Sequence, residues 1–230
     1  MLDFSDFECL SFDCYGTLID WEPGILGYLR PLLQNKGCNV SDAQILNFYS
    51  ECEPSQQELP YRSYREVLAS VMRELGKEFH IPLTEEEIHG LAGSIKTWQP
   101  FPDTVPALKR LKSRYRLAVL SNIDDDLFAS TAPRLEVKLD YVVTAQQVQS
   151  YKPSIRNFEV LLDRLRIDRR RLLHVAESLY HDVVPARALG IATVWVNRRQ
   201  NKPAAATRVV AAQPDLEVPT VAALADLAVR

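Results

Sequence analysis

The chain has 230 residues, of which 47% are apolar and 25% charged, and its formal net charge is −3. This composition excludes a disordered chain, and the scattered Lys and Arg residues form no basic patch for nucleic acid or an anionic membrane. No apolar run reaches the roughly 18 residues of a membrane span, and the first six residues, MLDFSD, are acidic where a signal peptide is basic. We therefore expect a cytoplasmic protein whose four cysteines are free thiols.

The first predicted element is a buried strand over residues 7–13, an apolar segment that ends near a turn at Gly16. Only helical patterns follow, over residues 20–97. Two prolines fall inside these patterns. Pro31 predicts a kink or a break in the first helix, and Pro54 predicts the end of the second.

Helices and strands alternate through the rest of the chain, and residues 200–213 form an Ala- and Pro-rich surface connection. The predicted helices are 104–113, 125–132, 155–165 and 181–189, and the predicted strands are 116–121, 141–144, 172–176 and 192–196. Such alternation is typical of a parallel sheet with helices on both faces, which is a Rossmann-like α/β fold. A single strand needs partners, so we expect a discontinuous core of residues 1–19 and 98–230, into which the helical segment 20–97 is inserted as a cap.

In open parallel sheets, ligands bind at the carboxyl ends of the strands. Four segments with polar side chains follow predicted strands, and the helical segment comes directly after the first of them, where it can close over the site. The four segments are Asp13, Ser121-Asn122, Ser150-Tyr151-Lys152, and Glu177 to Asp182.

These segments, in this order, resemble the four motifs of the haloacid dehalogenase superfamily. The matching sequences are Phe12-Asp13-Cys14-Tyr15-Gly16-Thr17-Leu18, Ser121-Asn122, Tyr151-Lys152-Pro153, and Glu177 with Asp182. The resemblance extends from about residue 7 to 198, and it implies that the helical segment is the cap of that superfamily.

The residue two positions after Asp13 separates two chemistries within the superfamily. Phosphatases carry a second Asp there, which protonates the leaving alkoxide, whereas this chain has Tyr15. A tyrosine hydroxyl has an ordinary pKa of ~10 and is a poor general acid at neutral pH, but a halide leaves without a proton. The pattern is therefore closest to the L-2-haloacid dehalogenases, and it implies hydrolysis of small 2-haloacids such as haloacetates, fluoroacetate among them.

The resemblance implies a role for each matched residue. Asp13 is the nucleophile that forms an ester with the substrate, and Lys152 keeps Asp13 ionised. The other catalytic roles fall to Thr17, which positions Asp13, and Asp182, which activates water. The substrate-binding residues are Tyr15, Ser121, Asn122 and Glu177.

Glu177 is a departure from the dehalogenases, which have Ser and Asn in this loop. Two interpretations stay open: Glu177 pairs with Lys152 in place of a metal, or Glu177 and Asp182 hold a divalent ion. We expect the former, with no cofactor.

A second departure concerns the halide, which the dehalogenases receive on an arginine of the cap. Residues 44–54 contain no Arg, and Arg30, Arg62 and Arg65 are the nearest in sequence. Asn122, Tyr15 or Trp21 are the other candidate donors. In addition, Phe158 stands where the family has a Tyr.

Two histidines lie close to the motifs. His181 precedes Asp182, and its side chain is expected to point away from the site, while His174 is expected to be a hydrogen-bonded core residue within a strand.

Two other functions stay open. One is a magnesium-dependent phosphatase of the same superfamily, which Glu177 and Asp182 favour and Tyr15 opposes. The other is an inactive relative that binds a partner through its cap, which the joint presence of Asp13, Lys152 and Asp182 opposes. The resemblance also implies a homodimer.

Overall fold

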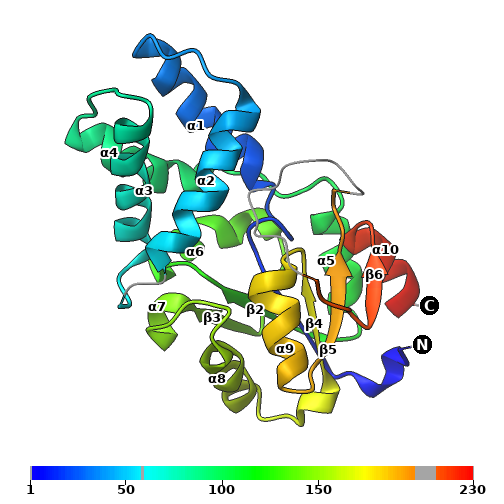
Figure 1. Ribbon diagram of the computed structural model, residues 1–230. Helices are drawn as coiled ribbons and strands as arrows, with labels where there is room; N and C mark the ends of the chain where they lie inside the picture. Colours follow the sequence, from blue (N-terminus) through cyan, green and yellow to red (C-terminus); the bar gives the residue numbers. More distant parts are fainter. Residues whose placement is uncertain (1, 58–59, 200–210, 230) are drawn as a thin grey trace.

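Six parallel strands form one sheet in the order β3-β2-β1-β4-β5-β6 in the computed structural model, which describes residues 2–57, 60–199 and 211–229 (Figure 1). The strands are β1 (Cys9–Phe12), β2 (Arg116–Ser121), β3 (Tyr141–Thr144), β4 (Leu172–Ala176), β5 (Ala192–Val196) and β6 (Leu216–Val218). This order is the Rossmann order, so the predicted α/β class is confirmed. Most of the predicted connection 200–213 lies outside the described residues.

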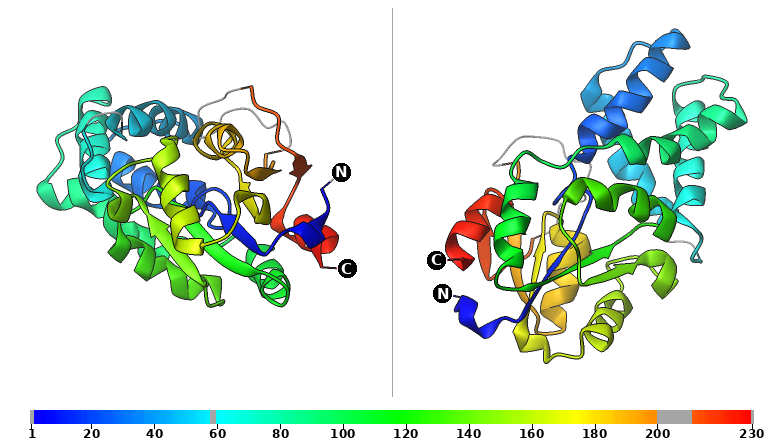
Figure 2. Two further views of the ribbon diagram at one scale, coloured as in Figure 1. Left: turned by 90° about the horizontal axis from the view of Figure 1, so that it is seen from below. Right: turned by 180° about the vertical axis from the view of Figure 1, so that it is seen from behind.

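Helices cover both faces of the sheet, because successive side chains of each strand point to opposite faces. Leu10 and Phe12 belong to the apolar cluster under α5, α6 and α10, whereas Cys9 belongs to the cluster under α8 and α9. Figure 2 shows the sheet between these two layers. The helices of the core are α5 (Thr104–Lys112), α6 (Asp125–Thr131), α7 (Ala145–Val148), α8 (Ile155–Leu165), α9 (Val184–Ala188) and α10 (Val221–Ala228), and short 3₁₀ turns are η1 (Phe4–Asp6), η2 (Ile95–Thr97), η3 (Ala132–Leu135) and η4 (Arg169–Arg171).

Four helices between β1 and α5 form a separate group beyond the carboxyl ends of the strands, which we call the cap (Figure 1). They are α1 (Trp21–Asn35), α2 (Asp42–Gln57), α3 (Tyr64–Glu78) and α4 (Glu85–Ser94). Capping boxes at Ser63 and Thr84 satisfy the first backbone N–H groups of α3 and α4. None of the described helices has both the length and the apolar character needed to cross a bilayer.

The predicted end of the second helix at Pro54 is wrong, and the first helix does not break at Pro31. Pro31 lies inside α1 and Pro54 inside α2, and both helices continue past them. A proline removes one backbone hydrogen bond, but Leu29 and Leu33 on either side of Pro31 are fully buried. Burial of the apolar face therefore keeps the helix continuous.

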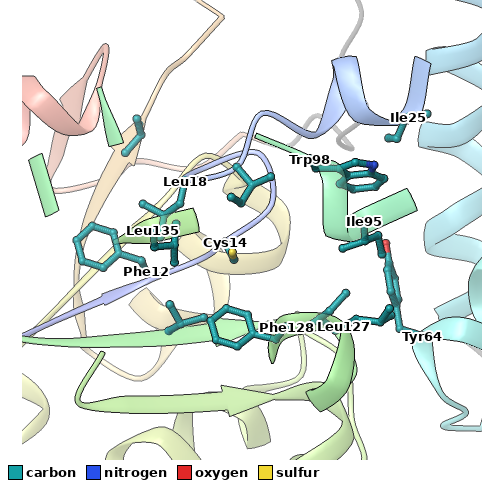
Figure 3. Packing of buried hydrophobic residues seen from close by; sticks show 14 of the residues in the cluster. Phe12, Cys14, Leu18, Ile25, Tyr64, Ile95, Trp98, Leu127, Phe128 and Leu135 are labelled. Carbon is teal, nitrogen blue, oxygen red and sulfur yellow. The ribbon is translucent and has the colours of Figure 1, made fainter. Parts of the chain in front are cut away.

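The cap and the core share one apolar cluster. Figure 3 shows Trp98, Ile95 and Tyr64 on the cap side, facing Leu127 and Phe128 of α6. The contact between the cap and the core therefore buries apolar surface of both.

Asp124 forms hydrogen bonds that connect the core to the cap. It lies just before α6, is buried, and its two carboxylate oxygens accept hydrogen bonds from the backbone N–H groups of Tyr64 (2.8 Å) and Arg65 (3.0 Å). These are the first residues of α3, whose N-terminus attracts a negative charge. The hydroxyl of Tyr151 adds a second contact, to the carbonyl of Arg62 (2.8 Å).

Asp124→Ala is expected to lower the free energy of unfolding by about 1–2 kcal/mol, because two buried N–H groups lose a charged acceptor. Asp126→Ala is the matched control, since its exposed ion pair with Arg65 contributes less than about 0.5 kcal/mol. Urea denaturation measures both variants. Equal losses would show that Asp124 contributes no more than a surface ion pair.

Candidate active site

Polar side chains from four segments meet at the carboxyl edge of the sheet. β1 pairs with β2 and β4 on its two sides, so Asp13, the first residue after β1, lies between the ends of these strands. Ser121 ends β2, and Asp182 belongs to η5 (Leu179–Val183), the turn that follows β4. Lys152 comes from the loop between α7 and α8. The order of the strands thus brings together residues that are far apart in the sequence.

The ammonium group of Lys152 joins two carboxylates. Its Nζ lies 2.9 Å from Oδ1 of Asp13 and 2.6 Å from Oδ1 of Asp182, and it donates a third bond to the carbonyl of Leu120 (3.0 Å). The lysine is only 2% exposed. A buried lysine with three acceptors is held in one orientation, so it fixes both carboxylates.

The turn after β1 presents Asp13 from the other side. Gly16 adopts a φ of +94°, which a residue with a side chain rarely tolerates. This turn brings Thr17 back towards the strand, where its hydroxyl donates to Oδ2 of Asp13 (2.8 Å) and accepts from the N–H of Glu177 (2.9 Å). Each oxygen of Asp13 therefore has one hydrogen-bond donor.

Burial and charge act in opposite directions in this group. Burial lowers the pKa of Lys152, but the two carboxylates outweigh it and raise that pKa, so the lysine is a cation. Burial raises the pKa of Asp182, but Lys152 and a hydrogen bond from His174 outweigh it and hold the pKa below its ordinary value. For Asp13, burial and the charge of Asp182 raise the pKa more than Lys152 and Thr17 lower it.

His174 contacts the site directly, which the sequence did not indicate. Its Nε2 lies 2.9 Å from Oδ1 of Asp182, and its Nδ1 lies 2.8 Å from the hydroxyl of Ser11. Phe158 packs edge-on against the imidazole, with 5.0 Å between ring centroids. His174 is thus a hydrogen-bonded core residue, as expected, but one of its partners is Asp182.

Asp182 keeps one oxygen for a further partner. Oδ1 accepts from Lys152 and His174, whereas Oδ2 is buried without a hydrogen-bond partner among the described residues. A buried carboxylate oxygen without a donor is costly. Asp182 also lines the active-site cavity, so Oδ2 is the oxygen of this carboxylate that has capacity for a further hydrogen bond.

Tyr15 lines the active-site cavity but does not serve as a proton donor. Its hydroxyl is engaged with Oγ1 of Thr131 (2.8 Å), and its ring packs edge-on against Trp98. Burial raises the pKa of this hydroxyl well above its ordinary value. Tyr15 therefore cannot serve as a general acid near neutral pH.

The side chain of Asn122 is bound to the main chain of the site. Its Oδ1 accepts from the N–H of Lys152 (2.7 Å), and its Nδ2 donates to the carbonyl of Lys152 (3.0 Å) and to Oε1 of Gln57 in the cap (3.2 Å). These bonds leave the amide little capacity for a substrate carboxylate. Ser121, which is buried beside the cavity, stays the better candidate.

The predicted pairing of Glu177 with Lys152 is wrong. Lys152 bonds Asp13 and Asp182 instead, and Glu177 lines a different pocket, together with Arg198 and Arg199 on the far side of the Gly16 turn. The reason is that the N–H of Glu177 is tied to Thr17, which leaves its side chain outside the cavity that contains Asp13.

The same geometry bears on a metal ion. The ammonium of Lys152 lies between the two carboxylates, Asp13 and Asp182, and the third acid, Glu177, faces elsewhere. Across residues 2–57, 60–199 and 211–229, no three His, Cys, Asp or Glu side chains are grouped as metal ligands would be. These residues do not fit a divalent ion held by Glu177 and Asp182.

The expectation that His181 points away is also wrong, since His181 lines the same cavity as Asp182. η5 is a π-helical turn, in which the N–H of Val183 bonds the carbonyl of Ser178 (3.3 Å). Such a turn contains more residues than an α-helical turn, so neighbouring side chains diverge less.

The cap closes the site with residues that the sequence did not single out. Glu53 and Gln57 of α2 and Tyr64 of α3 line the cavity together with Trp21, which was among the candidates. Glu53 is 6% exposed, although its segment of the sequence is polar.

None of the three candidate arginines reaches this cavity. Arg30 pairs with Asp42 at the surface, and Arg65 pairs with Asp126. Arg62 donates to Ser70 and Gln56.

The cavity between the cap and the sheet has a volume of about 50 Å³. This is room for roughly three to five water-sized groups, so only a very small molecule fits beside Asp13. The residues from the core that line it are Asp13, Tyr15, Ser121, Asn122, Lys152, Ser178, His181 and Asp182.

A family model described as haloacid dehalogenase-like hydrolase matches residues 7–190. The (S)-2-haloacid dehalogenase 4A of Burkholderia cepacia is 25% identical over 198 residues, which are 84% of each chain. The glyceraldehyde 3-phosphate phosphatase of Methanothermobacter thermautotrophicus is 31% identical over 160 residues, which are 63% of this chain and 70% of the phosphatase.

Solved structures agree on the fold. The L-2-haloacid dehalogenase of Xanthobacter autotrophicus, with chloropropionic acid covalently bound, superposes with a TM-score of 0.83. The match covers 96% of this chain and 98% of the other at 17% identity, so it shows a common fold.

Proposed function

The chain belongs to the haloacid dehalogenase-like hydrolases, and from this premise we propose that it hydrolyses the carbon–halogen bond of small 2-haloacids through an ester on Asp13. The observation that carries the proposal is the state of Tyr15. A nucleophilic carboxylate lies in the cavity, but the hydroxyl two residues on is committed to Thr131 and does not ionise near neutral pH. A leaving group that departs without a proton from this position fits such a site.

In the first step, Oδ of Asp13 attacks C2 of the haloacid. A carbon–oxygen bond forms, the carbon–halogen bond breaks, and the halide leaves with the bonding electrons. Lys152 and Thr17 hold the two oxygens of Asp13, so the attacking atom is already oriented. Ser121 is the proposed partner of the substrate carboxylate.

In the second step, water attacks the carboxyl carbon of the Asp13 ester. Oδ2 of Asp182 accepts a proton from this water, because this oxygen has no hydrogen-bond partner among the described residues and Lys152 holds the pKa of Asp182 below its ordinary value. The ester bond then breaks, the proton passes to the leaving alkoxide, and a 2-hydroxy acid is released. Asp13 is left as a carboxylic acid and loses its proton to solvent, which regenerates the nucleophile. His174 acts through Asp182, whose Oδ1 it holds.

The substrate class follows from the size of the cavity. Haloacetates have five heavy atoms, which matches the room for roughly three to five water-sized groups. The curated relatives named (S)-2-haloacid dehalogenases, at 22–26% identity, support the same class.

A phosphatase of the same family is the second candidate, since one relative is named a glyceraldehyde 3-phosphate phosphatase. The orientation of Glu177 and the place of Lys152 between Asp13 and Asp182 speak against a metal-dependent reaction at this site.

Halide release from chloroacetate, fluoroacetate and 2-chloropropionate separates these functions. We expect chloride release from chloroacetate with the same rate in EDTA and in magnesium, because Lys152 already neutralises the carboxylates. p-Nitrophenyl phosphate, assayed in parallel, should give no product. Phosphate release that depends on magnesium, without halide release, would establish the phosphatase instead.

The proposal also includes a cytoplasmic location and a homodimer. The described cysteines Cys9, Cys14, Cys38 and Cys52 are free thiols, which supports a reducing compartment. Light scattering of the purified chain decides the oligomeric state.

A further inference from the structure

Glu53 is a carboxylic acid on the side of the active-site cavity that the cap forms. It lies on α2, it is buried, and it shares the cavity with Asp13. Its Oε1 accepts two hydrogen bonds, from Nε2 of Gln57 (2.5 Å) and from the hydroxyl of Tyr64 (3.0 Å). Its Oε2 has no hydrogen-bond partner among the described residues. This second oxygen is therefore the one that can carry a proton.

The charges of the cavity favour that proton. Lys152 is the one Lys or Arg among the described cavity residues, and it is already shared by Asp13 and Asp182. An ionised Glu53 would add a third carboxylate to a small cavity that must accept the anion of a 2-haloacid. A neutral Glu53 removes this repulsion and adds a donor.

Among the described residues, the two side chains that are hydrogen-bonded to Glu53, Gln57 and Tyr64, carry no positive charge. On α2 it faces Tyr49, Cys52 and Gln57, and on α3 it faces Tyr64, whose hydroxyl also bonds that of Tyr49 (3.0 Å). Across the cavity lie Asp13, Lys152, His181 and Asp182 of the core. The charges of Glu53 and Arg62 both act on Tyr151, and the guanidinium of Arg62 donates to Ser70 and Gln56.

We propose that Glu53 is a catalytic acid of the cap, which donates a hydrogen bond from its protonated Oε2 to the departing halide. This inference rests on the proposed dehalogenase activity and supplies the halide partner that the cap arginines do not provide. As Asp13 attacks and the carbon–halogen bond breaks, the halide accumulates negative charge and accepts the hydrogen bond. The proton stays on Glu53, so the halide leaves as the anion and Glu53 does not have to be protonated again before the next turnover.

The pH dependence of Glu53 follows from its burial. Burial raises the pKa of its carboxyl to about 7, although the hydrogen bonds from Tyr64 and Gln57 lower it. The proton is therefore present below about pH 7 and lost above it. Since only the protonated form donates, kcat/KM for a haloacid should fall about tenfold per pH unit above pH 7.

The test compares pH profiles of halide release from chloroacetate for four proteins. In Glu53→Gln the amide keeps a donor that cannot ionise, so the alkaline fall should disappear, with activity at pH 6 within about tenfold of the wild type. In Tyr64→Phe a hydrogen bond that favours the ionised acid is lost, so the fall should move to higher pH. Glu51→Gln, at an exposed position of the same helix, should keep the wild-type profile.

A leaving-group series separates catalysis from a structural role. Glu53→Leu removes the donor, and the loss of one such donor costs about 10²–10³-fold in rate. Chloride accepts hydrogen bonds more strongly than bromide, so chloroacetate should lose several-fold more than bromoacetate. Equal losses for both halides would indicate a structural role and overturn the inference.

The remaining outcomes are distinct. An alkaline fall that persists unchanged in Glu53→Gln would overturn the role of Glu53 while leaving the dehalogenase intact. An absence of halide release from the wild type at every pH would refute the proposed function, and the role of Glu53 with it.

Discussion

Asp13→Asn should stop halide release, with kcat lower by about 10⁴-fold or more, as is found when a covalent nucleophile is removed. The asparagine side chain has nearly the same shape, and it can still meet Thr17 and Lys152, which contact the two oxygens of Asp13. What it lacks is the negative oxygen that forms the ester. The loss is therefore expected in kcat, while the protein stays folded. Asp126→Asn, at a surface ion pair, is the control.

A single turnover in ¹⁸O-labelled water tests the same prediction without a variant. If the ester forms on Asp13, the oxygen of the 2-hydroxy acid comes from Asp13, and the label enters the carboxylate of Asp13. Mass spectrometry of the peptide that contains Asp13 locates it. Label in the hydroxy acid of the first turnover would mean that water attacks the substrate directly and that Asp13 is no nucleophile.

The core of the fold could be predicted closely from sequence. The predicted bounds of strands 116–121, 141–144, 172–176 and 192–196 agree with β2, β3, β4 and β5. These strands are buried on both faces, so they are continuous apolar runs with clear ends. β6 spans only Leu216–Val218, which is too short to show a period, and neither it nor α10 was predicted.

The candidate site was predictable as a set of positions but not as a set of contacts. Asp13, Thr17, Lys152 and Asp182 lie within one hydrogen-bonded group because the strand order brings their segments together. Whether a side chain faces the cavity depends on the local turn. Spacing alone did not show that Glu177 leaves the cavity.

The residues that sequence missed are those whose surroundings are tertiary. Glu53 lies in a polar stretch of α2, whose composition is that of a helix face exposed to solvent. In the fold, however, α3 and the core cover Glu53. His174 lies inside an apolar strand, where a hydrogen-bonded core histidine is the ordinary interpretation, and only the π turn after β4 brings Asp182 to it. In both cases a buried polar side chain reaches the active site only because of an element that is distant in sequence or irregular in conformation, and a sequence pattern does not show such an arrangement.

Asp182→Asn should separate the two chemical steps. The amide oxygen can still accept from Lys152 and His174, so the neutral variant keeps Lys152 beside Asp13. Halide release in the first turnover should therefore survive. Hydrolysis of the ester should slow by about 10²–10⁴-fold, because the amide cannot take a proton from water.

The expected result is a burst of one halide per active site, followed by a slow phase, with Asp13 carrying the acid as an ester. Rapid mixing with chloroacetate measures the burst, and mass spectrometry of the intact protein detects the added carboxymethyl group. Its disappearance on further incubation should follow the slow phase. His174→Gln, which keeps a donor towards Asp182, should show a much smaller burst, because Asp182 remains ionised by Lys152. Halide and hydroxy acid released in equal amounts from the first turnover of Asp182→Asn would instead assign the activation of water to another group, and would leave Asp182 the single role of holding Lys152.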